Sequence, residues 1–167
     1  KPVLYVTNVD EAEIASNLRG DLAQNVFEMA EAQGNKAIRL CGSIEMEIST
    51  MDTEDRQLFL EEYTLSEPGL HKLIRSAYEL LGLETFFTAG EKEVRAWTIK
   101  NGYSAPQAAG VIHTDFQRGF IKAETYHYEE LIEFSTEKKL KELGKIRQEG
   151  KSYLVKDGDI IFFKFNV

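Results

Sequence analysis

The four residues from Asn8 to Glu11 have the types and spacing best suited to recognising a ligand. They directly follow the apolar run 3–7, which predicts a short buried strand. An Asn side chain both donates and accepts hydrogen bonds, whereas a carboxylate only accepts, so together they can pair with the edge of a purine base. The pattern is compatible with a base-reading loop in which Asn8 and Glu11 pair with the base.

The motif differs from the base-reading sequence Asn-Lys-x-Asp of common GTPases, whose Asp binds two donors of guanine. Val9 stands at the Lys position and Glu11 at the Asp position, so we expect this loop to read guanine poorly. Asp10 is expected to face solvent or to brace the loop. A plainer interpretation is that Asn8 and Glu11 only cap the turn after the strand, because Asn favours turns and caps.

A second loop, Cys41-Gly42-Ser43, follows a second apolar run at residues 37–41. Apolar residues at helical spacing lie between the two runs, and Gly34 is a plausible helix terminator. Strand, helix and strand in this length predict a βαβ unit with parallel neighbouring strands. Both loops then lie at the C-terminal ends of the strands, where ligands bind in such sheets.

Two helices are predicted after the second loop. The acidic segment 45–62 predicts a helix with Leu58 and Phe59 as its buried contacts. Pro68 suits the first turn of a helix that ends at Gly82. That helix carries an apolar stripe of Leu70, Leu73, Ile74, Ala77 and Leu81.

The second half changes to a strand-rich pattern near residue 84. Residues 85–89 and 94–99 flank a turn at 90–93 and predict a hairpin. Asn101-Gly102 predicts a turn, and Ser104 an N-cap. Residues 120–128, 152–155 and 160–165 are further strand candidates, the last buried on much of both faces. This order predicts a β-grasp, ubiquitin-like module.

Composition predicts a globular protein with an uneven charge. The 167 residues are 43% hydrophobic and 29% charged, and no run approaches the roughly 18 apolar residues that span a bilayer. Residues 1–83 carry the entire net charge of −8, which argues against broad nucleic-acid binding there. The single Cys41 cannot form a disulfide within one chain and predicts a reducing, cytoplasmic setting.

Six segments of the chain together match one protein family, although no single one of them would identify it. They are residues 1–11, 67–70, 85–90, 93–98, 105–116 and 157–167. Through them the chain resembles the C-terminal portion of the YchF/Ola1 family, ribosome-associated P-loop ATPases of the Obg-related group. The resemblance covers essentially the whole chain. It implies that residues 1–83 are the last part of a G domain and that residues 84–167 are a TGS domain, a β-grasp fold.

The resemblance also implies the roles of both loops. The family's Asn-x-x-Glu motif, associated with a preference for ATP over GTP, maps onto Asn8, Val9 and Glu11. The loop that closes over the base maps onto Cys41, Gly42 and Ser43. Physically, adenine offers no N1–H donor for a carboxylate to bind, and backbone N–H groups near Val9 or Gly42-Ser43 can meet its acceptor nitrogens. The implied cofactors of the intact protein are ATP, with GTP less favoured, and Mg²⁺.

The machinery for phosphate chemistry is missing from this sequence. No Gly-x-x-x-x-Gly-Lys-[Ser/Thr] loop occurs, nor the Mg²⁺-holding elements that accompany it. We therefore expect this chain alone to bind no nucleotide tightly and to hydrolyse none, and no catalytic or metal-ligating residue is assigned. Because a buried-type strand directly follows Lys1-Pro2, we expect the chain to be the C-terminal part of a longer protein.

The expected partner is the ribosome or ribosomal RNA, through the TGS domain, and no membrane. On charge alone, the candidate contacts are Arg95, Arg118, Lys122, Lys138, Lys139, Lys141, Lys145 and Arg147. A solvated helix face is the commoner meaning of such a cluster. His113 beside Asp115 is expected to be structural, not a general base. Two alternatives stay open: a pure RNA, ribosome or protein-binding module, and a small-ligand regulatory domain.

Overall fold

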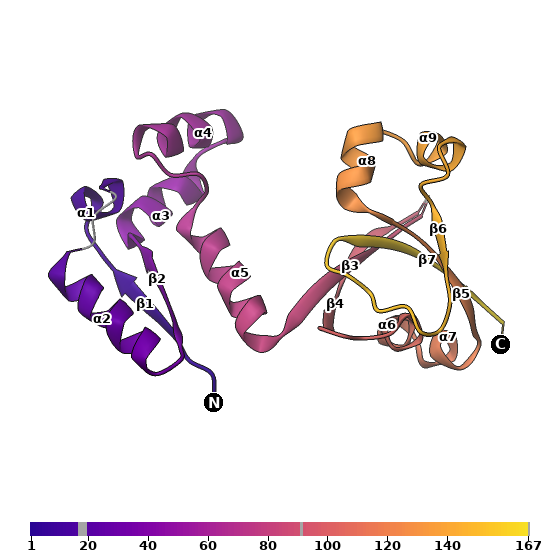
Figure 1. The fold of residues 1–167 in the computed structure, drawn as a ribbon. Helices are drawn as coiled ribbons and strands as arrows, with labels where there is room; N and C mark the ends of the chain where they lie inside the picture. The colour runs from indigo at the N-terminus through magenta and orange to yellow at the C-terminus, as the bar shows by residue number, and fades with distance from the viewer. Residues whose placement is uncertain (17–19, 91, 167) are drawn as a thin grey trace. The chain divides into compact units, whose positions relative to one another are not determined.

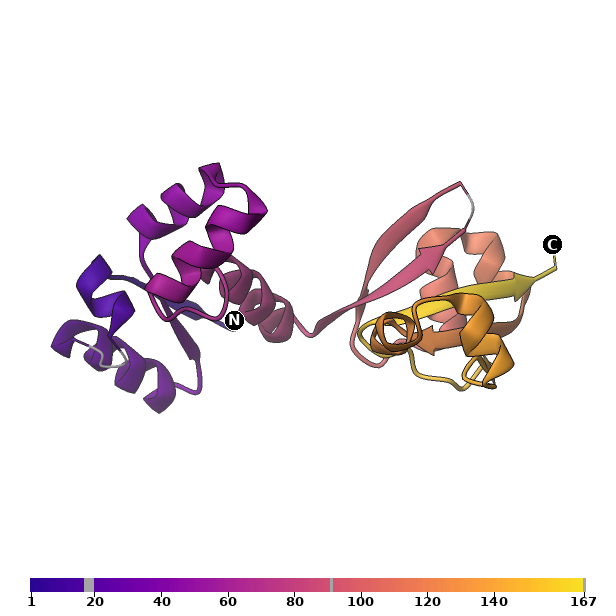
Figure 2. The ribbon, with the colours of Figure 1, turned by 90° about the horizontal axis from the view of Figure 1, so that it is seen from above.

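The computed structural model describes residues 1–16, 20–90 and 92–166, which form two compact units (Figures 1 and 2). The first unit spans Lys1–Leu81 and the second Gly82–Val167. The division falls two residues before the predicted boundary between residues 83 and 84. Within the described parts, no helix is both long enough and apolar enough to cross a membrane.

The first unit is built on a pair of parallel strands. Its elements in chain order are β1 (Leu4–Asn8), α1 (Glu11–Ala15), α2 (Asp21–Ala32), β2 (Lys36–Leu40), α3 (Gly42–Thr50), α4 (Thr53–Glu62) and α5 (Gly69–Leu81). The register pairs Leu4 with Lys36 and ends at Asn8 with Leu40, so the predicted parallel neighbours are confirmed. Both strands therefore end at the same edge of the sheet.

The predicted helix over residues 45–62 is in fact two helices. The chain turns at Met51, and Asp52 begins α4 by accepting from the N–H groups of Glu54 and Asp55, each at 3.0 Å. This break changes which side of the second helix faces inward. Leu60 is buried, whereas Leu58 is 65% exposed, so the prediction of a buried Leu58 was wrong.

The apolar stripe of α5 exists in the sequence but is not covered within the described residues. No residue of α5 is buried, and Leu70, Ile74 and Leu81 are each at least half exposed. Gly82, with φ +61°, follows the helix in a left-handed conformation that other residues rarely adopt, which ends α5 as predicted.

The second unit holds a five-stranded sheet in the order β4-β3-β7-β5-β6. Its elements are β3 (Leu83–Ala89), β4 (Val94–Lys100), α6 (Ala105–Ile112), α7 (Thr114–Arg118), β5 (Phe120–His127), α8 (Tyr128–Phe134), α9 (Glu137–Glu142), β6 (Arg147–Glu149) and β7 (Asp159–Phe165). The predicted hairpin of β3 and β4 is confirmed. Strand β7 pairs in parallel with β3 and antiparallel with β5. Ser104 begins α6, as predicted, and its N–H donates to Gln107 Oε1 at 2.8 Å.

Helices lie on both faces of this sheet, α6 and α7 on one and α8 and α9 on the other (Figures 1 and 2). The main core joins Phe86, Ile99, Ile161 and Phe163 of the sheet to small residues of α6. A second cluster joins the sheet to Leu140 of α9.

One predicted strand of the second unit is wrong, and one observed strand was not predicted. Residues 152–155 form no strand and make only an isolated bridge between Ser104 and Leu154. The edge strand is instead β6, which has too few apolar residues to be recognised by pattern. Strand β7 is buried on much of both faces, as predicted, because Ile161 and Phe163 pack in the main core and Ile160 packs in the cluster with Leu140. Phe162 is the exception, at 55% exposure.

Candidate functional site

The two predicted loops meet at the C-terminal ends of β1 and β2. Asn8 is the last residue of β1 and lies opposite Leu40, the last residue of β2. Val9 continues the ladder by donating its N–H to Leu40 O at 2.9 Å. Cys41 follows directly, and α3 begins at Gly42. The parallel register thus places both loops side by side.

Side-chain hydrogen bonds join the loops directly. Gly42 N–H donates to Asn8 Oδ1 at 2.9 Å, and Ser43 Oγ donates to Glu11 Oε1 at 3.0 Å. Cys41 Sγ lies 3.1 Å from Ser43 Oγ. A Cβ at position 42 would lie 3.3 Å from Asn8 Oδ1, so Gly42 permits this close approach. All the candidate base-contacting residues except Val9 take part in these bonds.

Asp10 braces the first loop. Its Oδ1 accepts from Glu13 N–H at 2.7 Å, which makes Asp10 the N-cap of α1 and confirms one of its two expected roles. Glu11 therefore begins α1, and Ile14 of the same helix packs in the core with Cys41. The loop is held by a helix, not by the strand alone.

The hydrogen bonds decide which groups remain to meet a ligand. Val9 N–H donates to Leu40 O and Gly42 N–H to Asn8 Oδ1, so of the backbone groups expected to meet a base these two already have partners within the chain. Asn8 Oδ1 is occupied, which leaves its Nδ2 as a donor. Within the described part of the chain, Ser43 N–H in the first turn of α3 has no acceptor. Asn8, Glu11 and Ser43 are exposed, whereas Cys41 is a core residue at 2% exposure.

A cavity of about 190 Å³ lies near β2 in the same unit. Its lining includes Arg39, Glu45 and Lys72 but none of the predicted base residues. Glu45 accepts from Gly69 N–H at 2.6 Å and from Leu70 N–H at 3.0 Å, so its carboxylate caps α5. No sequence pattern pointed to this contact, because Glu45 and Gly69 are far apart along the chain.

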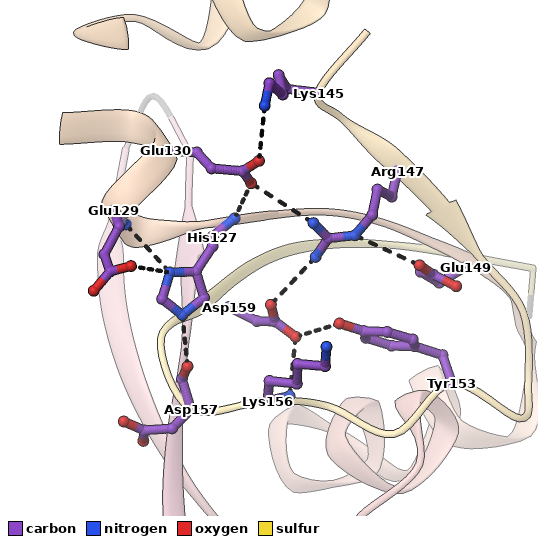
Figure 3. Close-up of polar contacts among 10 residues, drawn as sticks. All are labelled: His127, Glu129, Glu130, Lys145, Arg147, Glu149, Tyr153, Lys156, Asp157 and Asp159. Carbon is purple, nitrogen blue, oxygen red and sulfur yellow. Dashed lines mark hydrogen bonds and ion pairs between the residues drawn. The ribbon is translucent and has the colours of Figure 1, made fainter. Parts of the chain in front are cut away.

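Two of the predicted RNA contacts, Lys145 and Arg147, belong to one network of carboxylates (Figure 3). The Arg147 guanidinium lies 3.6 Å from carboxylate oxygens of Glu130, Glu149 and Asp159. Lys145 Nζ lies 3.9 Å from Glu130. Three surrounding negative charges make Arg147 poorly suited to a phosphate, and its position on β6 suits a role in holding that edge strand.

The centre of this network is Asp159, which is fully buried. Its Oδ2 accepts from Tyr153 Oη at 2.8 Å and from Lys156 N–H at 3.0 Å (Figure 3). Burial and the hydrogen bond to Asp159 raise the pKa of Tyr153 to about 12. No local signal in the sequence tied Asp159 to Tyr153 or Arg147.

The remaining basic candidates differ in availability. The Arg95 guanidinium lies 4.1 Å over the Trp97 ring, and Lys122 Nζ bonds Gln148 Oε1 at 2.9 Å. Arg118 is 81% exposed and lies 3.8 Å from Asp115. The lysines of α9 are exposed: Lys138, Lys139 and Lys141.

His113 is structural, as expected. Its Nδ1 accepts from Asp115 N–H at 3.2 Å and caps α7. Its ring also lies 6.0 Å from that of Phe116. A nitrogen that accepts the capping hydrogen bond is not free to act as a base.

Comparison with known proteins gives consistent matches. A family model, YchF-GTPase_C, described as a protein of unknown function (DUF933), matches residues 83–166. The proteins named "Ribosome-binding ATPase YchF" from Bacillus subtilis (strain 168) and Escherichia coli O157:H7 are 50% and 49% identical over 167 residues. Those matches cover 100% of this chain but 46% and 45% of the relatives, so the chain spans about half their length.

Two solved structures resemble the fold. The Schizosaccharomyces pombe YchF GTPase matches with a TM-score of 0.82 and 34% identity, over 98% of this chain and 43% of that one. A GTP-binding protein from Pyrococcus horikoshii OT3 matches with a TM-score of 0.64 over 99% of this chain and 46% of that one. At 16% identity, the second likeness shows a shared mixed α/β fold alone.

Proposed function

This chain belongs to the YchF family, and from that premise we propose that it supplies purine-base recognition and a docking module to a ribosome-associated, ATP-preferring P-loop NTPase. Residues 1–83 are proposed as the last part of its G domain. Residues 84–167 are proposed as a TGS domain of β-grasp fold. The strand order β4-β3-β7-β5-β6, with α6 packed on the sheet, supports the second assignment.

The observation that carries the base-recognition proposal is the pair of hydrogen bonds that tie Asn8 to Gly42 and Glu11 to Ser43. They bring two exposed polar loops to the C-terminal ends of parallel strands, where ligands bind in sheets of this type. The Asn8 Nδ2 donor fits a ring nitrogen acceptor of either purine. Discrimination between adenine and guanine then depends on Glu11 and its surroundings.

The residues present fit a base but not a triphosphate. The exposed groups at the two loops are a donor amide, a carboxylate and a backbone N–H. The sequence contains no P-loop to hold phosphates or Mg²⁺. We therefore propose that ATP hydrolysis, with Mg²⁺ as the charge-neutralising ion, belongs to the intact protein, and that this chain alone does not hydrolyse nucleotide.

The docking role is proposed for the second unit. The curated relatives are named as ribosome-binding, which supports a ribosomal partner in the cytoplasm. Lys138 and Lys141 of α9 are the strongest candidates for phosphate contacts, since Lys139 Nζ lies 5.9 Å from the Phe134 ring and Lys145 and Arg147 lie among carboxylates. Arg95, Arg118 and Lys122 remain weaker candidates because each has a partner within the chain.

Calorimetric titration of the full-length protein with ATP and GTP tests the base-recognition proposal. The double variant Val9→Lys and Glu11→Asp recreates the guanine-reading pattern and should shift the preference towards GTP by about tenfold or more, given the strength of hydrogen bonds to charged groups. Glu54→Asp, an exposed residue in the first turn of α4, is the matched control. An unchanged preference in the double variant would show that these loops do not set base choice.

The second candidate is a docking module without nucleotide function, favoured by the self-contained core of the second unit. Residues 82–167 should then bind ribosomal RNA with an affinity that falls as salt rises. Lys138→Glu with Lys141→Glu should weaken that binding. Glu137→Gln on the same helix is the charge-changing control. Salt-insensitive binding would point to a protein partner instead.

A further inference from the structure

The hydrogen bonds between the two loops have defined directions. An ionised carboxylate only accepts, so the Ser43 hydroxyl donates to Glu11 Oε1 at 3.0 Å. The Ser43 oxygen can then accept from the Cys41 thiol, whose Sγ is 3.1 Å away. The hydroxyl proton of Ser43 is therefore committed to Glu11 and is not offered to a ligand.

This bond decides where the Glu11 carboxylate lies. Glu11 is exposed at the start of α1, and its side chain has several staggered rotamers available. Ser43 is the second residue of α3, and the next residue, Ile44, is 1% exposed in the core. The flexible carboxylate is thus bound to a hydroxyl on a firmly packed helix.

We propose that Ser43 is a positioning residue that sets base preference by holding the Glu11 carboxylate against the start of α3. This proposal rests on the purine-recognition function proposed above. Guanine presents two adjacent donors, N1–H and the 2-amino group, and a carboxylate that can turn freely can accept from both. Adenine has an acceptor at N1 and no 2-amino group, so a fixed carboxylate loses nothing with adenine.

The site therefore discriminates against guanine in two ways: it has Glu11 in place of Asp, and the orientation of the Glu11 carboxylate is restrained. Replacing Asp with Glu lengthens the side chain, but the longer side chain could still reach guanine if it were free. The bond from Ser43 to Oε1 restrains the orientation of the carboxylate, so that it cannot turn to face both guanine donors. The Asn8 Nδ2 donor fits a ring nitrogen acceptor that both purines share, so the discrimination is assigned to Glu11.

The test compares the dissociation constants of ATP and GTP in the full-length protein by isothermal titration calorimetry. Ser43→Ala should tighten GTP binding on the order of tenfold, the scale of one hydrogen bond to a charged group, and change ATP binding little. Ser43→Thr keeps the hydroxyl and should retain the original ratio. Ser49→Ala makes the same change on α3, where Ser49 Oγ donates to Met46 O, and should leave the ratio unchanged.

A double-mutant cycle separates positioning from a merely structural role. In a Glu11→Gln background the amide cannot accept from both guanine donors, so Ser43→Ala should no longer alter the ratio. If Ser43→Ala does not fold, as judged by circular dichroism, Ser43→Cys keeps the volume with a weaker donor. Its ratio should move in the same direction by a smaller factor.

The outcomes distinguish this proposal from the one on which it rests. If the unaltered protein binds neither nucleotide, both proposals fail. If it prefers ATP, and Ser43→Ala and Ser43→Cys leave the ratio unchanged, only the positioning role of Ser43 is overturned. An equal effect of Ser43→Ala with and without Glu11→Gln would likewise overturn it.

Discussion

The two units of this chain differ in how completely each buries its own apolar surface. The largest buried cluster of the second unit has ten residues around a five-stranded sheet, whereas that of the first has five beside a two-stranded sheet. A two-stranded sheet is marginal without further packing. The candidate ligand loops lie in the unit with the smaller buried cluster. The polar network around buried Asp159 lies in the other unit.

This difference teaches that the buried polar groups and the candidate ligand-binding groups are different residues in different units. Asp159 is fully buried and has partners on three sides, which suits a structural role. Asn8, Glu11 and Ser43 are exposed, and the bonds from Gly42 to Asn8 and from Ser43 to Glu11 hold the two loops together. The following changes test that contrast, from the largest expected effect to the smallest.

The largest effect is expected in the core of the second unit. Phe86 has 0% exposure, so Phe86→Ala should lower the free energy of unfolding by about 3–5 kcal/mol through the cavity it leaves. Trp97 is the single tryptophan of the chain, so its fluorescence during urea denaturation reports on this unit. The control Phe162→Ala, at a 55% exposed position in the same sheet, should cost less than about 1 kcal/mol. Similar losses in both variants would contradict the assigned core.

The next effect is expected at Arg147. Arg147→Met removes the cation beside buried Asp159 and should destabilise the second unit by about 2 kcal/mol, less than a fully buried pair because Arg147 is partly exposed. Lys138→Met, on the exposed side of α9, should leave the unfolding midpoint unchanged. The same two variants should behave oppositely in RNA binding, with the larger loss for Lys138. If Arg147→Met instead weakened RNA binding with no loss of stability, the structural role would be wrong.

A smaller effect is expected at alkaline pH. The pKa of Tyr153 is about 12 in the folded chain and near 10 in the unfolded one, so the folded state retains this proton between these values. The stability that the Tyr153–Asp159 contact contributes is complete below pH 10 and is lost as pH rises towards 12. Tyr153→Phe should flatten this part of the pH–stability curve by about 1 kcal/mol, allowing for partial exposure of the ring. Spectrophotometric titration measures the pKa of Tyr153, and urea denaturation at several pH values measures the free energy of unfolding of the unaltered chain and of Tyr153→Phe.

The smallest effect is expected on α5. Ile74 is 50% exposed, so Ile74→Ser in this chain should change the free energy of unfolding by less than about 0.5 kcal/mol. The matched change Ile44→Ser, at 1% exposure in the first unit's core, should cost several kcal/mol. Denaturation followed by far-ultraviolet circular dichroism measures the two variants. A loss above about 2 kcal/mol for Ile74→Ser would mean that the apolar stripe of α5 is buried in solution, contrary to its exposure in this structure.

The fold was largely predictable where one signal dominates. The apolar runs before Asn8 and Cys41 and the helix between them gave the parallel pair, because a βαβ connection allows little else. The hairpin of β3 and β4 and the start of α6 at Ser104 followed from turn and capping residues. Leu58 was misplaced because a break capped by Asp52 shifts the helical phase, and β6 was missed because its three residues are all polar.

The sequence by itself determined which residues can read a base, because Asn, Glu and Ser carry the required donors and acceptors wherever they are placed. It also determined the parallel strand pair and the β3–β4 hairpin through hydrophobic period and turn chemistry. Only the tertiary structure decided that Ser43 donates to Glu11, that Gly42 N–H donates to Asn8 and that Arg147 forms an ion pair with Asp159. These partners are separated by 12 to 34 residues along the chain. Their pairing is fixed by strand register and helix packing, which no local pattern encodes.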